Sequence, residues 1–299
     1  MKILITGGSG LVGSRLTNHL INQGHDVRIL SRKRFRHLHA SVFEWNPSDN
    51  YIEDGALHGV DAVVNLAGAG VADRPWTEQR KKALLRSRVD SANCLFHHLQ
   101  LLDDRPAVVV NASAMGIYGY GGEEEVFTEM SPNGQDFLAK VCVEWERAAL
   151  QFSTLSTRLV LLRIGMVLDD KGGALKKMAR PIKFCVGSPL GSGDQMISWI
   201  HVEDMYRMIE FAMFNSALHG AYNAVSSHHV SNKEFTKTLA SVLKRPIMLP
   251  HVPEFLLKLL LGEMSDIVLK GSVVSNQKII ESGFQFKFDK LEGALKDLL

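Results

Sequence analysis

"KILITGGSGLVGSRL", residues 2–16, is the stretch that decides the fold. An apolar, β-branched run comes first, glycines occupy positions 7, 8, 10 and 13, and an amphipathic helical pattern follows. Glycines allow a tight turn that approaches a ligand closely, and the N-terminus of the following helix attracts negative charge. The stretch therefore predicts a strand, a turn and a helix that hold the pyrophosphate of a dinucleotide. The alternative is a glycine-rich turn without a ligand.

The same alternation continues through the first half of the chain. Five short apolar runs are separated by longer helical patterns, at 2–6, 25–31, 61–67, 106–113 and 157–165. Apolar runs without strict alternation suit parallel strands that are buried on both faces, and the helices between them supply the crossovers. The fold class expected is α/β, with a doubly wound parallel sheet.

The regular alternation ends after about residue 165. A glycine-containing stretch follows at 172–195, and a helix is expected near 204–215. The later segments cannot simply extend the sheet, and we expect a smaller lobe over the strand ends, where open α/β sheets bind ligands. The predicted division is a dinucleotide-binding domain of residues 1–169 and 198–229 and a substrate lobe of residues 170–197 and 230–299.

The composition limits the classes of partner. Thirty-four basic and thirty-two acidic residues leave the chain almost neutral, which argues against nucleic acid and anionic membranes. The three cysteines are far apart and show no metal-ligand spacing, which favours a reducing cytoplasm. The first apolar run is too short for a signal peptide, and no later run approaches a membrane span. We expect a cytoplasmic monomer or homodimer that takes a small-molecule substrate.

The end of the second predicted strand indicates which dinucleotide binds. An NAD site would offer an acidic side chain to the ribose, whereas this chain offers Ser31 and Arg32. A hydroxyl and a guanidinium suit a 2′-phosphate, so NADP(H) is favoured over NAD(H). Two alternatives stay open: the basic residues from 32 to 36 form a solvated loop, or they form a nucleic-acid patch that lacks interleaved aromatic residues.

Several motifs occur in order along the chain. They are TGGSGLVGS (6–14), NLAG (65–68), SAMGIYG (113–119), RIGMVL (163–168), GSPLGSGDQMISWIHVED (187–204), GAYNA (220–224) and VVSNQKIIESGFQFKF (273–288). Together they resemble the extended short-chain dehydrogenase/reductase superfamily, and more closely its atypical epimerase family of NAD-dependent epimerase/dehydratase-like proteins. The last motif is similar to that family's small C-terminal domain. The resemblance covers nearly the whole chain and implies a Rossmann-type core.

The resemblance also implies cofactor contacts at matching positions. These are Gly7, Gly10, Leu11, Val12, Gly13, Ser31, Arg32, Leu66, Ala67, Gly68, Arg88 and Leu162, the last of them near the nicotinamide. The alternative for Leu66 and Ala67 is simple strand packing. The alternative for Arg88 is an ordinary charge on a helix surface.

The catalytic pair that the resemblance implies is incomplete. The superfamily lowers the pKa of a tyrosine with a lysine four residues later, but four residues before Lys140 stands Asp136. Acid before base at this spacing is the favourable orientation for an ion pair on a helix. We therefore expect Asp136 and Lys140 to form a surface ion pair on the helix that begins near residue 136.

Other side chains remain as candidates for chemistry. The resemblance assigns a substrate hydrogen bond to Ser113. Tyr118, in the loop after the same strand, is expected either to contact the substrate with Ser113, one of the two acting as the catalytic acid/base, or to pack against the second lobe. Gln195 and Trp199 are the expected substrate contacts from the lobe. His201 is expected to be a hydrogen-bonded structural residue between the lobes.

Two further expectations concern Asp204 and the adjacent histidines 228 and 229. Asp204 is expected to cap the helix near 204–215 at its N-terminus. The adjacent His228 and His229 point apart on a strand and lack a further ligand, so no metal site is expected.

These observations lead to two functions. The first is an NADP(H)-binding oxidoreductase or epimerase-like enzyme of the extended short-chain type, acting on a small polar substrate without the usual tyrosine. The alternative is a non-catalytic NADP(H)-responsive binding or regulatory protein with a degenerate active site.

Overall fold

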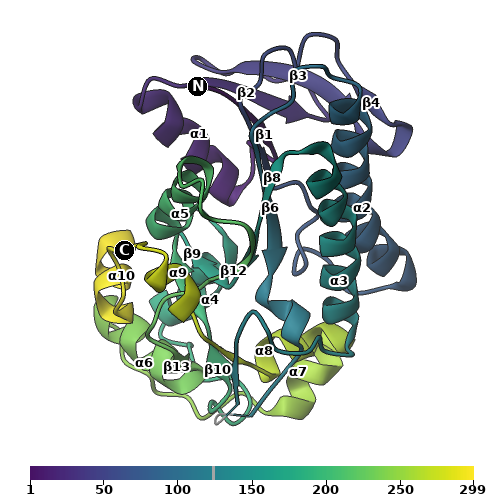
Figure 1. Ribbon diagram of the computed structural model, residues 1–299. Coiled ribbons are helices and arrows are strands. Elements are labelled where there is room, and N and C mark those ends of the chain that lie inside the picture. The colour runs from purple at the N-terminus through teal and green to yellow at the C-terminus, as the bar shows by residue number, and fades with distance from the viewer. Residues whose placement is uncertain (123–124) are drawn as a thin grey trace.

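The computed structural model describes residues 1–122 and 125–299, and its centre is one mostly parallel sheet (Figure 1). The strands of this sheet, in the order in which they lie side by side, are β12 (Gly220–Ala224), β8 (Arg158–Ile164), β6 (Val108–Ala114), β5 (Ala62–Asn65), β1 (Lys2–Thr6), β2 (Asp26–Ser31), β3 (Ser41–Asn46) and β4 (Tyr51–Ile52). Neighbours run parallel except β4, which pairs antiparallel to β3. The predicted doubly wound Rossmann-type fold is confirmed.

Chain order reverses direction between β1 and β5. From β1 the chain proceeds outward to β2 and β3, and from β5 it proceeds the other way to β6, β8 and β12. Open α/β sheets bind ligands at such a switch point, beyond the carboxyl ends of the strands. The topology therefore places the ligand crevice directly after the glycine turn.

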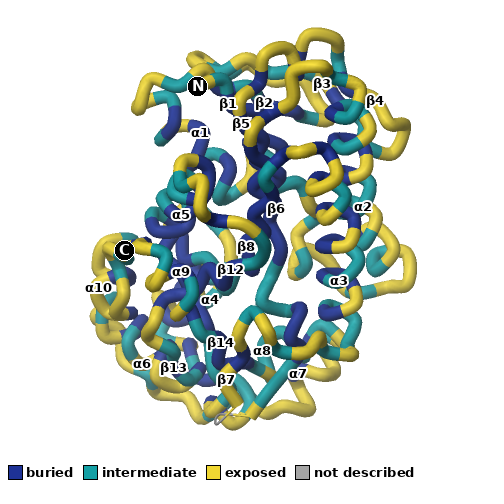
Figure 2. The backbone as a smooth tube through the Cα atoms, in the orientation of Figure 1, coloured by how far each residue is buried: buried dark blue, intermediate teal, exposed yellow. Residues whose placement is uncertain are grey.

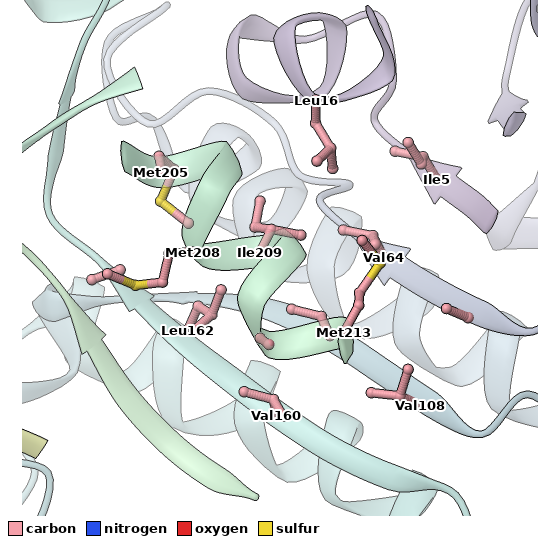
Figure 3. Close-up of a cluster of buried hydrophobic side chains, with 14 of the residues drawn as sticks. Ile5, Leu16, Val64, Val108, Val160, Leu162, Met205, Met208, Ile209 and Met213 are labelled. Atoms are coloured by element: carbon pink, nitrogen blue, oxygen red, sulfur yellow. The ribbon is translucent and has the colours of Figure 1, made fainter. Parts of the chain in front are cut away.

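Two pairs of helices cover the two faces of the sheet (Figure 1). The helices α1 (Leu11–Asn22) and α5 (Val202–Phe214) lie on one face, and α2 (Glu78–Gln100) and α3 (Phe137–Leu150) lie on the other. Leu16 of α1 and Met208 of α5 are fully buried against the first face, in the same hydrophobic cluster as Val160 of β8 (Figure 3). The strands are buried on both faces, as the dark central tube in Figure 2 shows, which is why their sequences do not alternate.

The remaining elements form the lower part of Figure 1. Its helices are α4 (Gly173–Lys183), α6 (Asn232–Val242), α7 (Glu254–Leu261), α8 (Asp266–Leu269), α9 (Gln277–Glu281) and α10 (Leu291–Leu298). Its short strands are β7 (Val126–Phe127), β9 (Met166–Leu168), β10 (Met196–Ile197), β11 (Trp199–His201), β13 (Val230–Ser231) and β14 (Val273–Val274). Single-turn 3₁₀ helices occur at Pro47–Asp49, Met115–Tyr118, Gln151–Leu155 and Gly262–Ser265.

A second hydrophobic core holds this lobe together. Leu175 of α4, Phe235 of α6 and Leu295 of α10 are fully buried in it. Ile279 and Phe284, which lie in the predicted substrate lobe, pack instead in the cluster between the sheet and α5. The two predicted units therefore share part of their packing, and the C-terminal segment returns to the central sheet.

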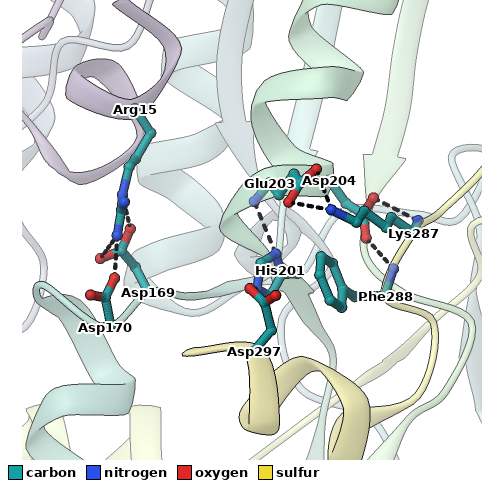
Figure 4. Close-up of polar contacts among 9 residues, drawn as sticks. All are labelled: Arg15, Asp169, Asp170, His201, Glu203, Asp204, Lys287, Phe288 and Asp297. Carbon is teal, nitrogen blue, oxygen red and sulfur yellow. Dashed lines mark hydrogen bonds and ion pairs between the residues drawn. The ribbon is translucent and has the colours of Figure 1, made fainter. Parts of the chain in front are cut away.

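Asp204 anchors this returning segment (Figure 4). Its fully buried carboxylate accepts hydrogen bonds from the backbone N–H groups of Lys287 and Phe288, both at 2.8 Å, and from Arg207 at 2.9 Å. The prediction that Asp204 caps α5 is wrong, because the helix begins two residues earlier. The ring of His201 caps it, with Nδ1 accepting from the N–H of Glu203 at 3.1 Å.

We expect Asp204→Ala to lower the free energy of unfolding by about 3 kcal/mol, because two buried N–H groups lose their acceptor. Urea denaturation measures this loss. Limited proteolysis should show faster cleavage near residue 287. Glu203→Gln is the matched control, since the Glu203 carboxylate binds the solvent-exposed Lys287 ammonium group, and it should leave both measurements nearly unchanged. Equal effects from the two variants would contradict the anchoring role.

His201 gives the fold a pH dependence. Its ring is buried, lies 3.9 Å from the Phe288 ring, and has Nε2 3.4 Å from a carboxylate oxygen of Asp297. Burial lowers the pKa of His201, although Asp297 opposes this. The unfolded chain therefore binds a proton, near the ordinary histidine pKa of about 6.5, at a pH where the folded protein does not.

Stability should consequently fall as the pH decreases from about 7.5 through 6.5 to 5.5. His201→Asn retains an acceptor for the helix cap and removes the titrating ring. In urea denaturation, we expect this variant to lose less free energy of unfolding between about pH 7.5 and about pH 5.5 than the unaltered protein does. Burial also lowers the pKa of His25 and His229, so some dependence should remain. An unchanged slope in the variant would contradict the assignment.

Candidate cofactor groove and reaction end

The turn after β1 has no space for side chains. Gly7 has a φ of +68°, and a Cβ atom added there would lie 2.8 Å from the carbonyl oxygen of Leu66. A Cβ atom at Gly13 would lie 2.2 Å from the carbonyl oxygen of Gly7. Gly10 caps α1 without a side-chain hydrogen bond, so N–H groups of the first turn are left for an anion. The turn fits a pyrophosphate at the switch point.

A groove of about 1730 Å³ extends from this turn between the ends of β2 and β5 and the side of α2. Seven of the predicted cofactor contacts line it: Gly7, Gly10, Ser31, Arg32, Leu66, Ala67 and Gly68. The predicted contacts Leu11, Val12 and Gly13 do not line the groove and form the start of α1. Cβ atoms added at Gly172 and Gly173, where α4 begins, would lie 3.2 and 3.0 Å from the side chain of Leu11.

Positive charge gathers in the groove. Arg32 and Lys33 line it on the β2 side, and Lys82 and Arg86 line it from α2. Arg34, in the same basic loop, is instead paired with Glu53 and Glu44 on the surface. The basic loop therefore divides into cations that face the groove and one that is neutralised locally, a distinction that spacing along the sequence does not reveal.

Two predicted contacts lie elsewhere. Leu162 is 1% exposed and belongs to the core between the sheet and α5 (Figure 3), so its placement gives no support to the predicted contact with the nicotinamide. The strand continues two residues beyond it, to Ile164. Arg88 does not line the groove itself: its guanidinium lies close to Gly68, which does, and its guanidinium carbon is 5.0 Å from the centre of the Trp145 ring.

The expected ion pair on α3 does not form. Asp136 is the N-cap of α3, where a carboxylate oxygen accepts from the N–H of Ala139 at 3.0 Å, and Lys140 points to solvent. The side chains that face the end of β6 are Leu138 and Cys142. A Cβ atom added at Gly116 would lie 3.6 Å from the Cβ of Leu138 and 3.9 Å from the Sγ of Cys142.

Neither of these two side chains replaces the usual tyrosine and lysine. Leu138 has no exchangeable proton, and burial raises the pKa of the Cys142 thiol to about 12. Two residues four positions apart on α3 thus face the sheet edge, as the usual tyrosine and lysine would, but these residues are Leu138 and Cys142. The sequence predicted a missing pair from Asp136 and Lys140, whereas the side chains near the end of β6 are Leu138 and Cys142.

Ser113 and Tyr118 belong to a buried polar network. The Ser113 hydroxyl donates to Glu146 at 2.7 Å, and Glu146 accepts two hydrogen bonds from Arg163 at 2.8 and 2.9 Å. Arg163 also donates to the Tyr118 hydroxyl at 2.9 Å, which in turn donates to Asn223 at 2.6 Å. The network joins β6, α3, β8 and β12.

This network occupies the polar atoms that a substrate would need. Ser113 and Tyr118 are 2% and 3% exposed, and burial raises the pKa of Tyr118 further above its ordinary value. Their placement therefore supports structural roles and gives no support to the expected substrate contacts. Sequence reasoning missed Glu146, Arg163 and Asn223, since their pairing depends on contacts between distant segments.

The predicted substrate contacts from the lobe are also internal. Trp199 is fully buried, and its indole N–H donates to the carbonyl of His228 at 2.8 Å, so it has no route to a substrate. The amide of Gln195 donates to the carbonyls of Leu190 and Val268 and so links its own loop to α8. These two residues therefore shape the lobe from within.

Arg15 of α1 joins the cofactor turn to the lobe. Its guanidinium donates to Asp169 at 2.8 Å and also contacts Asp170, both immediately after β9 (Figure 4).

Within residues 1–122 and 125–299 no three His, Cys, Asp or Glu side chains gather as metal ligands. In the same residues, no helix combines the length and apolar character needed to cross a membrane.

Comparisons with known proteins agree with this geometry. The model of the NAD dependent epimerase/dehydratase family matches residues 3–224, and that of a domain of unknown function, DUF1731, matches residues 252–298. Epimerase family protein YfhF of Bacillus subtilis is 38% identical over all of this chain and 98% of its own length. The chloroplastic epimerase family protein SDR39U1 homolog of Arabidopsis thaliana is 37% identical over all of this chain and 87% of its own.

Solved structures show the same similarity. Human epimerase family protein SDR39U1, determined with NADPH, has a TM-score of 0.90 and 30% identity over 100% of this chain and 99% of that one. UDP-glucose 4-epimerase of Thermotoga maritima, determined with UDP-glucose, has a TM-score of 0.81 at 18% identity, covering 100% and 97%. The second similarity shows the fold alone.

We expect Glu146→Gln to lower the free energy of unfolding by about 3 kcal/mol, because it leaves the buried Arg163 guanidinium without a counter-charge. Tyr118→Phe should cost about 1–2 kcal/mol, since Arg163 and Asn223 each lose one hydrogen bond. Urea denaturation measures both. Glu144→Gln on the same helix, which removes an exposed pair with Arg147, is the control and should change little. A Glu146 variant as stable as the control would show that the network is not stabilising.

Proposed function

The chain belongs to the NAD-dependent epimerase/dehydratase family, and from that premise we propose that it is an NADP(H)-binding oxidoreductase or epimerase-like enzyme acting on a small polar substrate. The observation that carries the cofactor assignment is the groove beside the glycine turn, with Arg32 and Lys33 at its β2 end. The relative determined with NADPH supports the same choice.

The chain's own residues would hold the cofactor in two parts. N–H groups of the glycine turn and the start of α1 would bind the pyrophosphate. Arg32 and Lys33 would bind the 2′-phosphate, because β2 ends in Ser31 and no acidic residue there repels it. The nicotinamide would supply or accept a hydride when the cofactor is bound. Arg88 stays a predicted contact, and the closeness of its guanidinium to Gly68, which lines the groove, supports this.

A second function is favoured by one specific observation. Leu138 and Cys142 face the sheet edge where the family's usual acid/base pair would stand. A protein in this condition could bind NADP(H) and respond to it without catalysis. We therefore keep a non-catalytic NADP(H)-responsive regulatory protein as the alternative.

The proposed cellular compartment follows from the state of the three cysteines. Cys94 and Cys142 are buried and Cys185 is partly exposed, and all three are free thiols. Free thiols suit a reducing compartment, so we propose the cytoplasm and a monomer or homodimer.

We expect NADPH to bind about 10- to 100-fold more tightly than NADH, because hydrogen bonds to a charged phosphate contribute about 1.5–3 kcal/mol. Arg32→Gln should remove most of this preference by weakening NADPH alone. Isothermal titration calorimetry with both cofactors measures it. Arg34→Gln, two residues away and paired with Glu53, is the matched control and should keep the preference. Equal affinities in the unaltered protein would overturn the NADP(H) assignment.

Catalysis and regulation are separated by a second experiment. Deuterium transfer from 4-deuterated NADPH is screened over carbonyl compounds and sugar nucleotides. Transfer to any substrate supports the enzyme. NADPH binding without transfer, together with a cofactor-dependent change in proteolysis of residues 170–200, would favour the regulatory protein.

A further inference from the structure

A second cavity, of about 550 Å³, lies between the N-terminal ends of α2 and α3 and the lobe helices α7 and α8. Trp76, Tyr120 and Phe137 line it together with charged side chains from both lobes. Small-molecule sites commonly measure about 300–1,000 Å³ and combine aromatic walls with a few polar groups. Neither the groove beside the glycine turn nor the buried network includes these three aromatic residues.

We propose that this cavity binds the ring of an uncharged, planar substrate, and that the Tyr120 hydroxyl donates a hydrogen bond to a carbonyl or hydroxyl oxygen on that substrate. The proposal rests on the proposed function, since it names the substrate class for the same enzyme. It moves the phenol that contacts substrate from Tyr118 to Tyr120.

The aromatic walls are held in fixed positions. The rings of Trp76 and Phe137 meet edge to face, 5.1 Å apart at an angle of 66°. The indole N–H of Trp76 donates to the carbonyl of Val71 at 2.8 Å, and the Lys81 ammonium lies 5.5 Å from the Phe137 ring. Ring faces and edges attract further planar rings, so a preformed aromatic corner favours an aromatic or other flat ligand.

The cations around the cavity are already paired. Lys81 contacts Glu263 and Glu78, Lys258 contacts Glu254, and Asp266 contacts Lys270. The Asp136 carboxylate accepts a hydrogen bond from the backbone at the start of α3 and has no cationic partner among the described residues. The described lining therefore offers no free cation to an anionic ligand, and an uncharged ligand loses less on entering than an anion does.

Tyr120 is the phenol with an unused hydroxyl. Its ring is partly buried beneath the Lys270 ammonium at 5.2 Å, and its Oη makes no hydrogen bond to any residue in 1–122 or 125–299. Burial, with Asp136 and Asp266 nearby, raises the pKa of Tyr120, so Oη keeps its proton at neutral pH. The Tyr118 hydroxyl, by contrast, accepts a hydrogen bond from Arg163 and donates one to Asn223.

The cavity lies at the start of α3, close to the segment that follows β6. Asp136 and Phe137 line it and directly precede Leu138. A Cβ atom added at Gly116, two residues after β6, would lie 3.6 Å from the Cβ of Leu138. Tyr120 lies on the same segment, four residues after Gly116. The cavity is therefore near the strand end where Leu138 and Cys142 stand in place of the usual tyrosine and lysine.

Three related probes test the proposal by isothermal titration calorimetry, with the full-length protein saturated with NADP⁺ so that no turnover occurs. They are 2-naphthaldehyde, which has a ring and a carbonyl, naphthalene, which lacks the oxygen, and 2-naphthoate, which is charged. We expect saturable 1:1 binding of 2-naphthaldehyde and at least tenfold weaker binding of 2-naphthoate. Trp76→Ala should weaken 2-naphthaldehyde about tenfold or more.

Tyr120→Phe isolates the hydrogen bond. It should weaken 2-naphthaldehyde roughly three- to tenfold and leave naphthalene unchanged, because only the aldehyde offers an acceptor. Tyr51→Phe, at an exposed tyrosine on β4, is the matched control and should change neither affinity. The proposal is overturned by absent binding of 2-naphthaldehyde, by tighter binding of 2-naphthoate, or by an equal loss for both uncharged probes in Tyr120→Phe.

The failure of the proposed function gives a different result. NADPH affinity is measured separately in each variant and should stay within about twofold of the unaltered protein. Unaltered protein that does not bind NADPH overturns the proposed function, and a parallel titration without cofactor then still decides whether the ring site exists. A large loss of NADPH affinity in Tyr120→Phe would make Tyr120 a cofactor contact and overturn the ring-site assignment alone.

Discussion

The backbone contact between the glycine turn and the end of β5 is the constraint on which the rest of the structure depends. Gly7 and Gly13 leave no space for a Cβ atom, and Gly7 lies directly against the carbonyl of Leu66. This contact fixes the start of α1 beside the point where strand order reverses. The cofactor groove, its cations and the reaction end all take their positions from it.

The register of α3 decides which side chains face the end of β6, where the family's usual acid/base pair would stand. The Asp136 carboxylate caps α3 by accepting a hydrogen bond from the helix backbone. With this start, Leu138 and Cys142 face the strand ends. One turn further, Glu146 enters the buried network with Arg163. Breaking such a pair leaves a charge in a low-dielectric interior, a cost of several kcal/mol, so the network holds β6 and β8 in place rather than serving a substrate.

Polar contacts join the lobe to the central domain. Asp204 and His201 at the start of α5 hold the C-terminal segment, and Arg15 holds the residues after β9 (Figure 4). In the same lobe, α7 and α8 lie over the ends of α2 and α3, where the aromatic cavity forms. The cavity is therefore a product of lobe docking, and its lining comes from segments nearly two hundred residues apart.

The sequence by itself determined the fold class, the glycine turn, the basic end of β2 and the absence of the usual tyrosine and lysine, because these depend on local spacing and on residue type. Only the tertiary structure decided that Leu162, Trp199 and Tyr118 are internal and that Tyr120 faces a cavity. A residue's neighbours across the fold determine which of its atoms are already hydrogen-bonded. Spacing along the chain carries no information about partners such as Asn223, which lies 105 residues from Tyr118.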